Sequence, residues 1–267
     1  MARSPGLFIW YELMTRDVAA AKAFYDAVTG WTIAAESSVP GGSMDYRMIG
    51  RSDGGFAGGF LGLSDDMQAN GARPGWLGYL HVTDVDNAVA AIVAEGGVIH
   101  MPPQTMPGVG RMAMVADPQG APIYIMTATP PAQNPDAASD VFSVDQPQHI
   151  RWNELQSSDP DASVAFYTKH FGWTQQGDMD MGPMGKYRFI QHDGVGIGAI
   201  MGKMAELPHS VWSFYIGVDD IDCAVAAVTA GGGSLNGPIN QIPGGEFSVH
   251  ATDPQGLTFG LVGPRKS

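Results

Sequence analysis

The sequence contains one pattern of an aromatic residue and an acid twice, as Trp10-x-Glu12 and Trp152-x-Glu154. The first copy lies in "FIWYELM" and the second in "HIRWNEL", and these short runs favour a β-strand at each place. Because side chains two residues apart on a strand share a face, each tryptophan is expected beside its glutamate. Such a pair could bind a flat or cationic small molecule by stacking, cation–π contact and charge.

Two other interpretations of the glutamates stay open. In the structural one, each glutamate binds a neighbouring backbone group or an arginine, Arg47 or Arg188, as a buried pair. In the chemical one, a glutamate acts in metal-free acid–base chemistry, and Glu12 orients His81 as a base across the sheet. The catalytic candidates are therefore Glu12, His81 and Glu154, and the sequence does not decide whether a reaction is catalysed.

The Trp-x-Glu pattern belongs to a longer internal repeat. The segment 10–31 recurs at 152–173, 142 positions later, and each copy continues into Phe-Tyr and Gly-Trp. Further along, "WLGYLHVTDVDNAVAAIVAEGG" recurs as "WSFYIGVDDIDCAVAAVTAGGG", and "DPQG" recurs, both 136 positions later. We therefore predict two modules, residues 7–128 and 148–264, joined by a linker rich in Pro, Ala and Asp at 129–147.

Each module reads as strand, helix and hairpin, followed by a second strand, helix and hairpin. Asp17 and Asp159 stand where helix N-caps belong, and Gly30 and Gly172 end those helices. Turns at 53–54 and 193–194 predict hairpins. The pattern is βαβββ twice in each module, which indicates an α+β fold in which Phe-Tyr and Gly-Trp serve as scaffold.

This tandem order, with an F-Y-x-x-x-x-G-W helix end and a late D-P-x-G hairpin, resembles the vicinal oxygen chelate superfamily. That superfamily includes glyoxalase I, bleomycin-resistance proteins and extradiol dioxygenases. The resemblance implies paired βαβββ units that form curved mixed sheets around a shared cleft. In metal-dependent members, it further implies a divalent ion held by His, Glu or Gln from four strands, with positions left for substrate.

The positions that correspond to those metal ligands hold other residue types here. Three of the four positions fall, in the two modules, on Trp10 and Trp152, Leu77 and Ser213, and Tyr124 and Gly260. The strand stretches 54–63 and 194–204 contain no His, Glu, Asp or Gln. We therefore expect no cofactor, and keep as the alternative a divalent metal held by a displaced set, Glu154, His192 and His250.

The same strand alternation extends the set of candidate ligand-binding residues. The full set is Trp10, Glu12, Tyr46, Met48, Tyr79, Tyr124, Trp152, Glu154, Tyr187 and Tyr215. Four methionines of the first module, Met101, Met106, Met112 and Met114, either line an apolar pocket or fill the core.

Composition limits the partners. The 27 acidic against 14 basic residues give a formal charge of −13, which excludes an electrostatic footprint for nucleic acid or anionic lipid. The single cysteine, Cys223, excludes an internal disulfide, and no apolar run has the length of a membrane span. We expect a cytoplasmic protein with a small-molecule partner. A monomer should suffice because the duplication supplies the two-fold pair internally, and a homodimer is the other option.

Two functional hypotheses follow. The first is a metal-independent binding protein for an aromatic or amphipathic small molecule. The alternative is a divalent-metal-dependent lyase, isomerase or dioxygenase with a non-standard ligand set.

Overall fold

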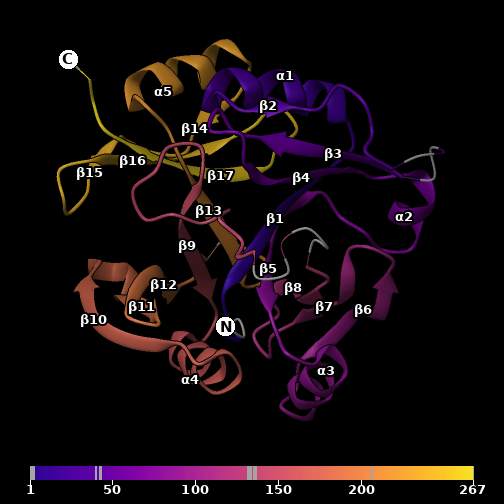
Figure 1. Ribbon diagram of the computed structural model, residues 1–267. Coiled ribbons are helices and arrows are strands. Elements are labelled where there is room, and N and C mark those ends of the chain that lie inside the picture. Colours follow the sequence, from indigo (N-terminus) through magenta and orange to yellow (C-terminus); the bar gives the residue numbers. More distant parts are fainter. Residues whose placement is uncertain are drawn as a thin grey trace. The chain divides into compact units, whose positions relative to one another are not determined.

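The chain is an α+β protein whose strands belong to two curved mixed sheets, of eight and nine strands within the described residues (Figure 1). The computed structural model describes residues 4–39, 41, 44–130, 134, 137–205 and 207–266. Each sheet consists of two groups of strands, and each group contains a helix after its first strand. The predicted fold class and the tandem layout are confirmed.

The first module holds two of these groups. Its first group comprises β1 (Phe8–Thr15), α1 (Val18–Thr29), β2 (Thr32–Ile33), β3 (Asp45–Gly50), β4 (Phe56–Gly62) and the short α2 (Asp65–Ala69). Its second group comprises β5 (Gly75–His81), α3 (Val85–Ala94), β6 (Val98–Met106), β7 (Gly110–Ala116) and β8 (Pro122–Ala128).

The second module repeats this order. Its first group comprises β9 (Ile150–Ser157), α4 (Pro160–Phe171), β10 (Thr174–Asp180), the 3-10 turn η1 (Gly182–Met184), β11 (Lys186–His192) and β12 (Val195–Gly202). Its second group comprises β13 (Val211–Gly217), α5 (Ile221–Ala230), β14 (Ser234–Leu235), β15 (Asn240–Gln241), β16 (Phe247–Thr252) and β17 (Thr258–Gly263).

Strand order is the same in equivalent groups. The orders are β2-β3-β4-β1, β5-β8-β7-β6, β10-β11-β12-β9 and β13-β17-β16-β14, and β15 pairs with β16. The first strand of each group pairs in parallel with the last, and the hairpin strands pair antiparallel. The helices therefore cover one face of each group, and the other face carries the alternate side chains.

The helix boundaries follow the predicted signals. The Asp17 carboxylate accepts a hydrogen bond from the backbone N–H of Ala20, and Gly30 ends α1 in the left-handed conformation. Asp159 caps α4 in the same way, with Pro160 at the first turn. Proline suits that position because a helix leaves its first N–H groups without intrahelical partners.

Two compact units divide the chain, and each takes one group from each module. The central unit contains the chain up to Ile9, Leu77–Ser139 and Asn153–Trp212. The terminal unit contains Trp10–Trp76, Asp140–Trp152 and Ser213 onward. In the terminal unit α1 lies beside α5, as Figure 1 shows.

The repeated Phe-Tyr and Gly-Trp residues form the aromatic cores of these units. In the terminal unit, Tyr25 contacts Trp31, Trp76 and Phe259, with ring centroids 5.2 to 6.2 Å apart. In the central unit, Tyr167 stacks on Trp173 at 4.9 Å. Full burial of large rings is among the stronger sources of packing energy, so this part of the repeat is scaffold, as predicted.

Part of the segment predicted as a linker is packed. Val141 is buried, and the carboxylate of Asp140 binds the buried guanidinium of Arg51 at 2.5 Å. Residues 131–133, 135 and 136 of that segment lie outside the described residues. Among the helices that are described, none has the length and hydropathy to cross a membrane.

Candidate ligand-binding site

The first group of module one places Trp10, Glu12, Tyr46 and Met48 on the sheet face opposite α1. Gly59 of β4 lies between Glu12 of β1 and Met48 of β3 in the sheet register. Glu12, Gly59 and Met48 therefore share a face. The indole Nε1–H of Trp10 donates to the Tyr46 hydroxyl at 2.6 Å. Trp10 and Tyr46 are thus joined on the face that carries Glu12, and their use as a ligand platform stays a prediction.

A glycine allows Tyr46 to lie flat on this face. A Cβ added to Gly59 would stand 2.3 Å from the Tyr46 hydroxyl oxygen and 2.4 Å from Cζ, which no packing tolerates. A side chain at position 59 would therefore displace the tyrosine and separate it from Trp10. Glu12 is buried on the same face, with 3% of its surface exposed.

In the first group of module two, two side chains donate hydrogen bonds to the glutamate. The Tyr187 hydroxyl donates to Glu154 Oε2 at 2.9 Å, and the amide of Gln156 donates to Glu154 Oε1 at 3.3 Å. Glu154 is 3% exposed, and these hydrogen bonds offset part of the free-energy penalty of burying a carboxylate. Trp152 lies two residues earlier on β9, on the same face and half-buried.

Neither arginine suggested as a counter-ion for these glutamates takes that role. Arg47 pairs with Asp45 at 2.9 Å, and Arg188 pairs with Asp161 at 2.7 Å. The reason is strand alternation: Arg47 lies opposite Phe60 and Arg188 opposite Ile200, so both point to the face that the glutamates do not share.

The second group of module one carries a stacked tyrosine pair. Tyr79 and Tyr124 are directly opposite each other, with ring centroids 4.2 Å apart and planes inclined by 11°. Met114 lies opposite Tyr124, and Met112 lies opposite Met126, which extends the face with thioether side chains.

The methionines of this group divide between the two alternatives. Met112 is buried and acts as core, whereas Met101, Met106 and Met114 are partly exposed. Met101 lies opposite Met114. The methionine-rich face is therefore partly core and partly accessible surface.

His81 ends the same face of β5. Its Nδ1–H donates to the backbone carbonyl of Met126 at 3.3 Å, and the side chain is buried. His81 belongs to the central unit and Glu12 to the terminal unit. A catalytic pairing of these two residues stays a prediction.

The second group of module two contains a tyrosine–histidine pair. The Tyr215 hydroxyl is hydrogen-bonded to Nε2 of His250, and both side chains are partly exposed. Tyr215 lies opposite Gly260, which in turn lies opposite His250. A Cβ on Gly260 would stand 2.4 Å from the tyrosine ring, so glycine again provides the surface on which a tyrosine lies.

The sequence profile of the Glyoxalase/Bleomycin resistance protein/Dioxygenase superfamily matches residues 8–125 and 146–261. The chain belongs to this superfamily. The two matched segments agree with the repeat, and the tandem arrangement is that of a two-module member.

Two relatives of known sequence match nearly the whole chain. CFP32 of Mycobacterium tuberculosis, whose name calls it a glyoxylase, is 32% identical over 257 residues, or 96% of this chain and 94% of its own. The anthracycline biosynthesis protein DnrV of Streptomyces peucetius is 27% identical, over 97% of this chain and 94% of its own.

Solved structures of the superfamily share the fold. A Mn(II)-bound glyoxalase from Novosphingobium aromaticivorans has a TM-score of 0.65 at 15% identity, over 98% of this chain and 83% of that chain. Homoprotocatechuate 2,3-dioxygenase from B. fuscum also has a TM-score of 0.65, at 16% identity, over 100% of this chain and 74% of that chain.

The residues at the superfamily's metal positions do not fit a divalent ion. The two modules offer Trp10 and Trp152, Leu77 and Ser213, and Tyr124 and Gly260 there, a set without imidazole or carboxylate. Tyr124 and Gly260 occupy equivalent positions in the two modules. Tyr124 lies opposite Tyr79 in the first module, and Gly260 lies opposite Tyr215 in the second.

The displaced ligand set draws on both compact units. Among the residues that the structure describes, no group of three or more His, Cys, Asp or Glu is placed to hold a metal ion. His192 donates from Nε2 to the Pro5 carbonyl at 2.7 Å, and His250 is engaged with Tyr215. The grouping of Glu154, His192 and His250 as a metal triad stays a prediction, since Glu154 and His192 belong to the central unit and His250 to the terminal unit.

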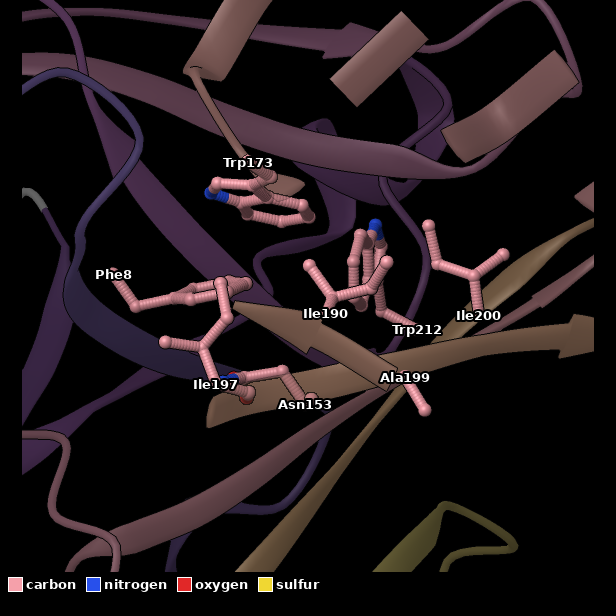
Figure 2. Close-up of a pocket in the computed structure, with 9 residues that line it drawn as sticks. Phe8, Asn153, Trp173, Ile190, Ile197, Ala199, Ile200 and Trp212 are labelled. Atoms are coloured by element: carbon pink, nitrogen blue, oxygen red, sulfur yellow. The ribbon is translucent and has the colours of Figure 1, made fainter. Parts of the chain in front are cut away.

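Two hollows lie away from all of these residues. Figure 2 shows an interior gap of the central unit lined by aromatic and aliphatic side chains, among them Phe8, Trp173 and Trp212. The gap has no room for a water molecule, and its one polar side chain, Asn153, donates to the Ile197 carbonyl at 2.6 Å. It is part of the core. A second hollow, of about 350 Å³, lies between α3 and α4 and contains none of the predicted ligand-binding residues.

Several contributors to the candidate faces were missed by sequence reasoning. Gln156 follows Glu154 by two residues, so strand alternation could have indicated it. Gly59 and Gly260 carry no side chain, and only the register of the sheet shows that a tyrosine lies over each of them.

Proposed function

We propose that this protein binds a planar aromatic small molecule without using a metal ion. One observation supports this most directly: in both modules the positions that correspond to the superfamily's metal ligands hold no imidazole or carboxylate. The same sheet faces carry the Trp10–Tyr46 pair, the Tyr79–Tyr124 stack and the buried glutamates. These features suit binding by stacking, and no bond-making step follows from them.

The buried carboxylates add a charge preference. Glu154 is held in place by Tyr187 and Gln156, so its orientation is set before a ligand arrives. An aromatic ligand that also carries an amine would gain a charge-assisted contact with such a group. The Streptomyces relatives are named for anthracycline biosynthesis, and the fused planar rings of an anthracycline are a ligand of this class.

The test is a thermal-shift screen of the full chain against aromatic compounds with and without amines, run in chelator-treated buffer. We expect an aromatic ligand to raise the unfolding midpoint. Gly59→Ala should weaken the binding of that ligand, because the added methyl group displaces Tyr46. The substitution Gly237→Ala, at an exposed position where an added Cβ would have no atom within 4 Å, is the matched control for a glycine variant.

The competing hypothesis is a divalent-metal lyase, isomerase or dioxygenase. It is favoured by the Mn(II)-bound glyoxalase, which shares the fold of this chain. Elemental analysis of purified protein separates the two. Stoichiometric metal that raises the midpoint, together with no response to any aromatic compound, contradicts the proposal. Turnover that is lost in Glu12→Gln or Glu154→Gln, with no metal present, would instead indicate acid–base chemistry.

A further inference from the structure

The hollow between α3 and α4 marks a difference between the two compact units. In the terminal unit the corresponding helices, α5 and α1, pack closely: a Cβ added to Gly231, at the end of α5, would stand 2.9 Å from Cδ2 of Phe24. In the central unit the position equivalent to Gly231 is Glu95, 136 positions earlier. A glutamate side chain does not fit into a contact that is too close for a methyl group.

Two basic residues of α4 meet this glutamate. The Glu95 carboxylate pairs with Lys169 and lies 3.1 Å from Nε2 of His170. The equivalent positions of α1, 142 residues earlier, hold Ala27 and Val28. Small and apolar residues in one unit are thus replaced by a charged cluster in the other. Lys169 and His170 also line the hollow of about 350 Å³.

The lining of the hollow follows one face of α3. It extends from the N-cap Asp84 to Ile92, which is about 12 Å along a helix that rises about 1.5 Å per residue. Between these ends Ala88 and Ala91 are small, and Phe171 of α4 contributes an aromatic wall. Ile92 and Phe171 are each 1% exposed. The hollow is therefore elongated, and its middle is apolar.

The two ends of the hollow carry opposite charges. At the N-cap end, Asp84 accepts hydrogen bonds from the backbone N–H and the side-chain amide of Asn87. A carboxylate has about four acceptor sites, so Asp84 can also accept an ammonium group. At the other end Lys169 pairs with Glu95, three residues beyond Ile92. An ammonium group has further N–H donors, which a second carboxylate can use.

We infer that this hollow binds a small elongated molecule with an ammonium group at one end, a carboxylate at the other and an apolar chain between them. The ammonium group lies at Asp84, the apolar chain on Ile92 and Phe171, and the carboxylate at Lys169. The volume lies in the range of small-molecule pockets, about 300 to 1,000 Å³. None of the residues of the proposed aromatic site lines this hollow, so the inference does not depend on that function.

The probe is 8-aminooctanoic acid, whose amine and carboxylate stand at opposite ends of a linear chain. Its isomer 2-aminooctanoic acid has the same groups on neighbouring carbons, octanoic acid lacks the amine, and octylamine lacks the carboxylate. Each is titrated into the full chain at neutral pH, and ligand-observed NMR measures the dissociation constant. We expect 8-aminooctanoic acid to bind more tightly than the other three, because it alone can reach both charged ends.

Two charge variants assign the ends. Asp84→Asn, which keeps a good N-cap residue, should weaken 8-aminooctanoic acid about fivefold without weakening octanoic acid. Lys169→Met should weaken 8-aminooctanoic acid by a similar factor without weakening octylamine. The matched controls are Asp220→Asn, at the equivalent N-cap of α5, and Lys22→Met on α1, and both should bind as the wild type does.

A third variant fills the apolar middle. Ala91 lines the hollow, whereas its neighbour Ala90 does not, and both are exposed on α3. Ala91→Phe should abolish the binding of all four probes, and Ala90→Phe should retain it. Equal unfolding midpoints of these two variants show that Ala91→Phe is folded.

Each outcome bears on the inference. It is overturned if 8-aminooctanoic acid does not bind the wild type, if its isomer binds equally well, or if Ala91→Phe binds as Ala90→Phe does. Unchanged affinity in both Asp84→Asn and Lys169→Met would show that the charged ends are not used, and would overturn it as well. The response of aromatic ligands to Gly59→Ala is a separate measurement, so the proposed function stands or fails independently.

Discussion

Two buried tyrosine–aspartate contacts connect residues that are far apart in the sequence. The Tyr167 hydroxyl donates to Asp117 Oδ2 at 3.1 Å in the central unit, and Tyr25 donates to Asp253 Oδ2 at 3.3 Å in the terminal unit. The other oxygen of each aspartate accepts two backbone N–H groups of its own D-P-Q-G turn. Each contact joins the helix of one module to the turn of the other.

Burial makes these aspartates unusual acids. Desolvation raises the pKa of Asp117 and of Asp253, although hydrogen bonds to the carboxylates act in the opposite direction. A carboxyl group whose pKa is raised by folding stabilises the folded state below its unfolded pKa. That contribution is lost as the pH rises through the folded pKa.

Asp117→Asn should therefore change how stability depends on pH. The amide can still accept the two backbone N–H groups and donate to Tyr167, so the variant should fold. The variant lacks the titrating carboxyl group and therefore lacks this pH-dependent contribution. The unfolding free energy of the wild type minus that of the variant should increase as the pH falls from neutral toward about 4. The increase should be about 1.4 kcal/mol for each unit by which folding raises the pKa.

Asp86→Asn is the control for this pH series, because folding lowers the pKa of Asp86 whereas it raises that of Asp117. The Arg111 side chain lowers the pKa of Asp86, so the contribution of Asp86 is present at neutral pH and is lost as the pH falls. Thermal unfolding of both variants from neutral to acidic pH measures the two trends. If the unfolding free energy of the wild type minus that of Asp117→Asn stays constant or falls in acid, the raised pKa of Asp117 is contradicted.

At the scale of elements, strand alternation was enough to predict which side chains share a face. It grouped Trp10 with Glu12 and Tyr46 with Met48, and the helix caps at Asp17 and Asp159 were also readable. These signals are local, because they depend on the period of a strand and on the unpaired N–H groups of a helix end.

Cross-strand partners were not predictable, because they depend on register. The same Trp-x-Glu pattern gives a Trp10–Tyr46 bond in one module and a Tyr187–Glu154 bond in the other. The expected arginine partners failed for the same reason, since Arg47 points to the opposite face.

The segment 129–147 was predicted as a linker, and Arg51 explains why part of it, around Asp140, is packed. The Arg51 guanidinium, 2% exposed, binds Asp53 in its own turn, Asp140 in the segment and the carbonyl of Phe56. Composition did not indicate this anchor, because Pro, Ala and Asp are typical of mobile linkers and the partner lies about ninety residues away.

Arg51→Ala should release this segment. We expect a loss of about 2 kcal/mol in unfolding free energy, because several hydrogen bonds and the packing of the aliphatic stem are removed together. Hydrogen exchange should accelerate in 137–148. Arg265→Ala removes an exposed pair with Asp222 and should change stability less than Arg51→Ala does. Unchanged exchange in the segment would show that Arg51 is not its anchor.

At the scale of the whole molecule, the compact units do not follow the repeat. Each unit combines one group of strands from each module, and its core depends on that combination. In the terminal unit, Phe24 and Tyr25 of α1 pack on Phe259 of β17. The Thr15 hydroxyl also donates a hydrogen bond to Gln255 Oε1 at 2.8 Å. In the central unit Ser163 donates to Gln119 at 3.2 Å. The sequence repeat therefore describes the duplication, whereas the packing unit is shared between the copies.

A chain cut between the modules should consequently fold only when both parts are present. Fragments 1–130 and 131–267 each contain a complete predicted module but only half of each aromatic core. Alone, each should be unfolded or self-associated, since its Tyr–Asp partner and its facing aromatic residues are missing. Mixed in equal amounts, they should form a one-to-one complex with the near-ultraviolet circular dichroism of the intact chain.

Light scattering after size exclusion measures the stoichiometry of that complex, and Asp253→Ala in the second fragment tests the contact that joins the parts. Removing the buried acceptor leaves the Tyr25 hydroxyl and two backbone N–H groups without their partner, which should weaken association more than tenfold. An Asp222→Ala fragment, changed at an exposed site on α5, should associate as the unmodified one does. If fragment 1–130 alone is a folded monomer, the module itself is the folding unit, and the shared cores only hold two independent modules together.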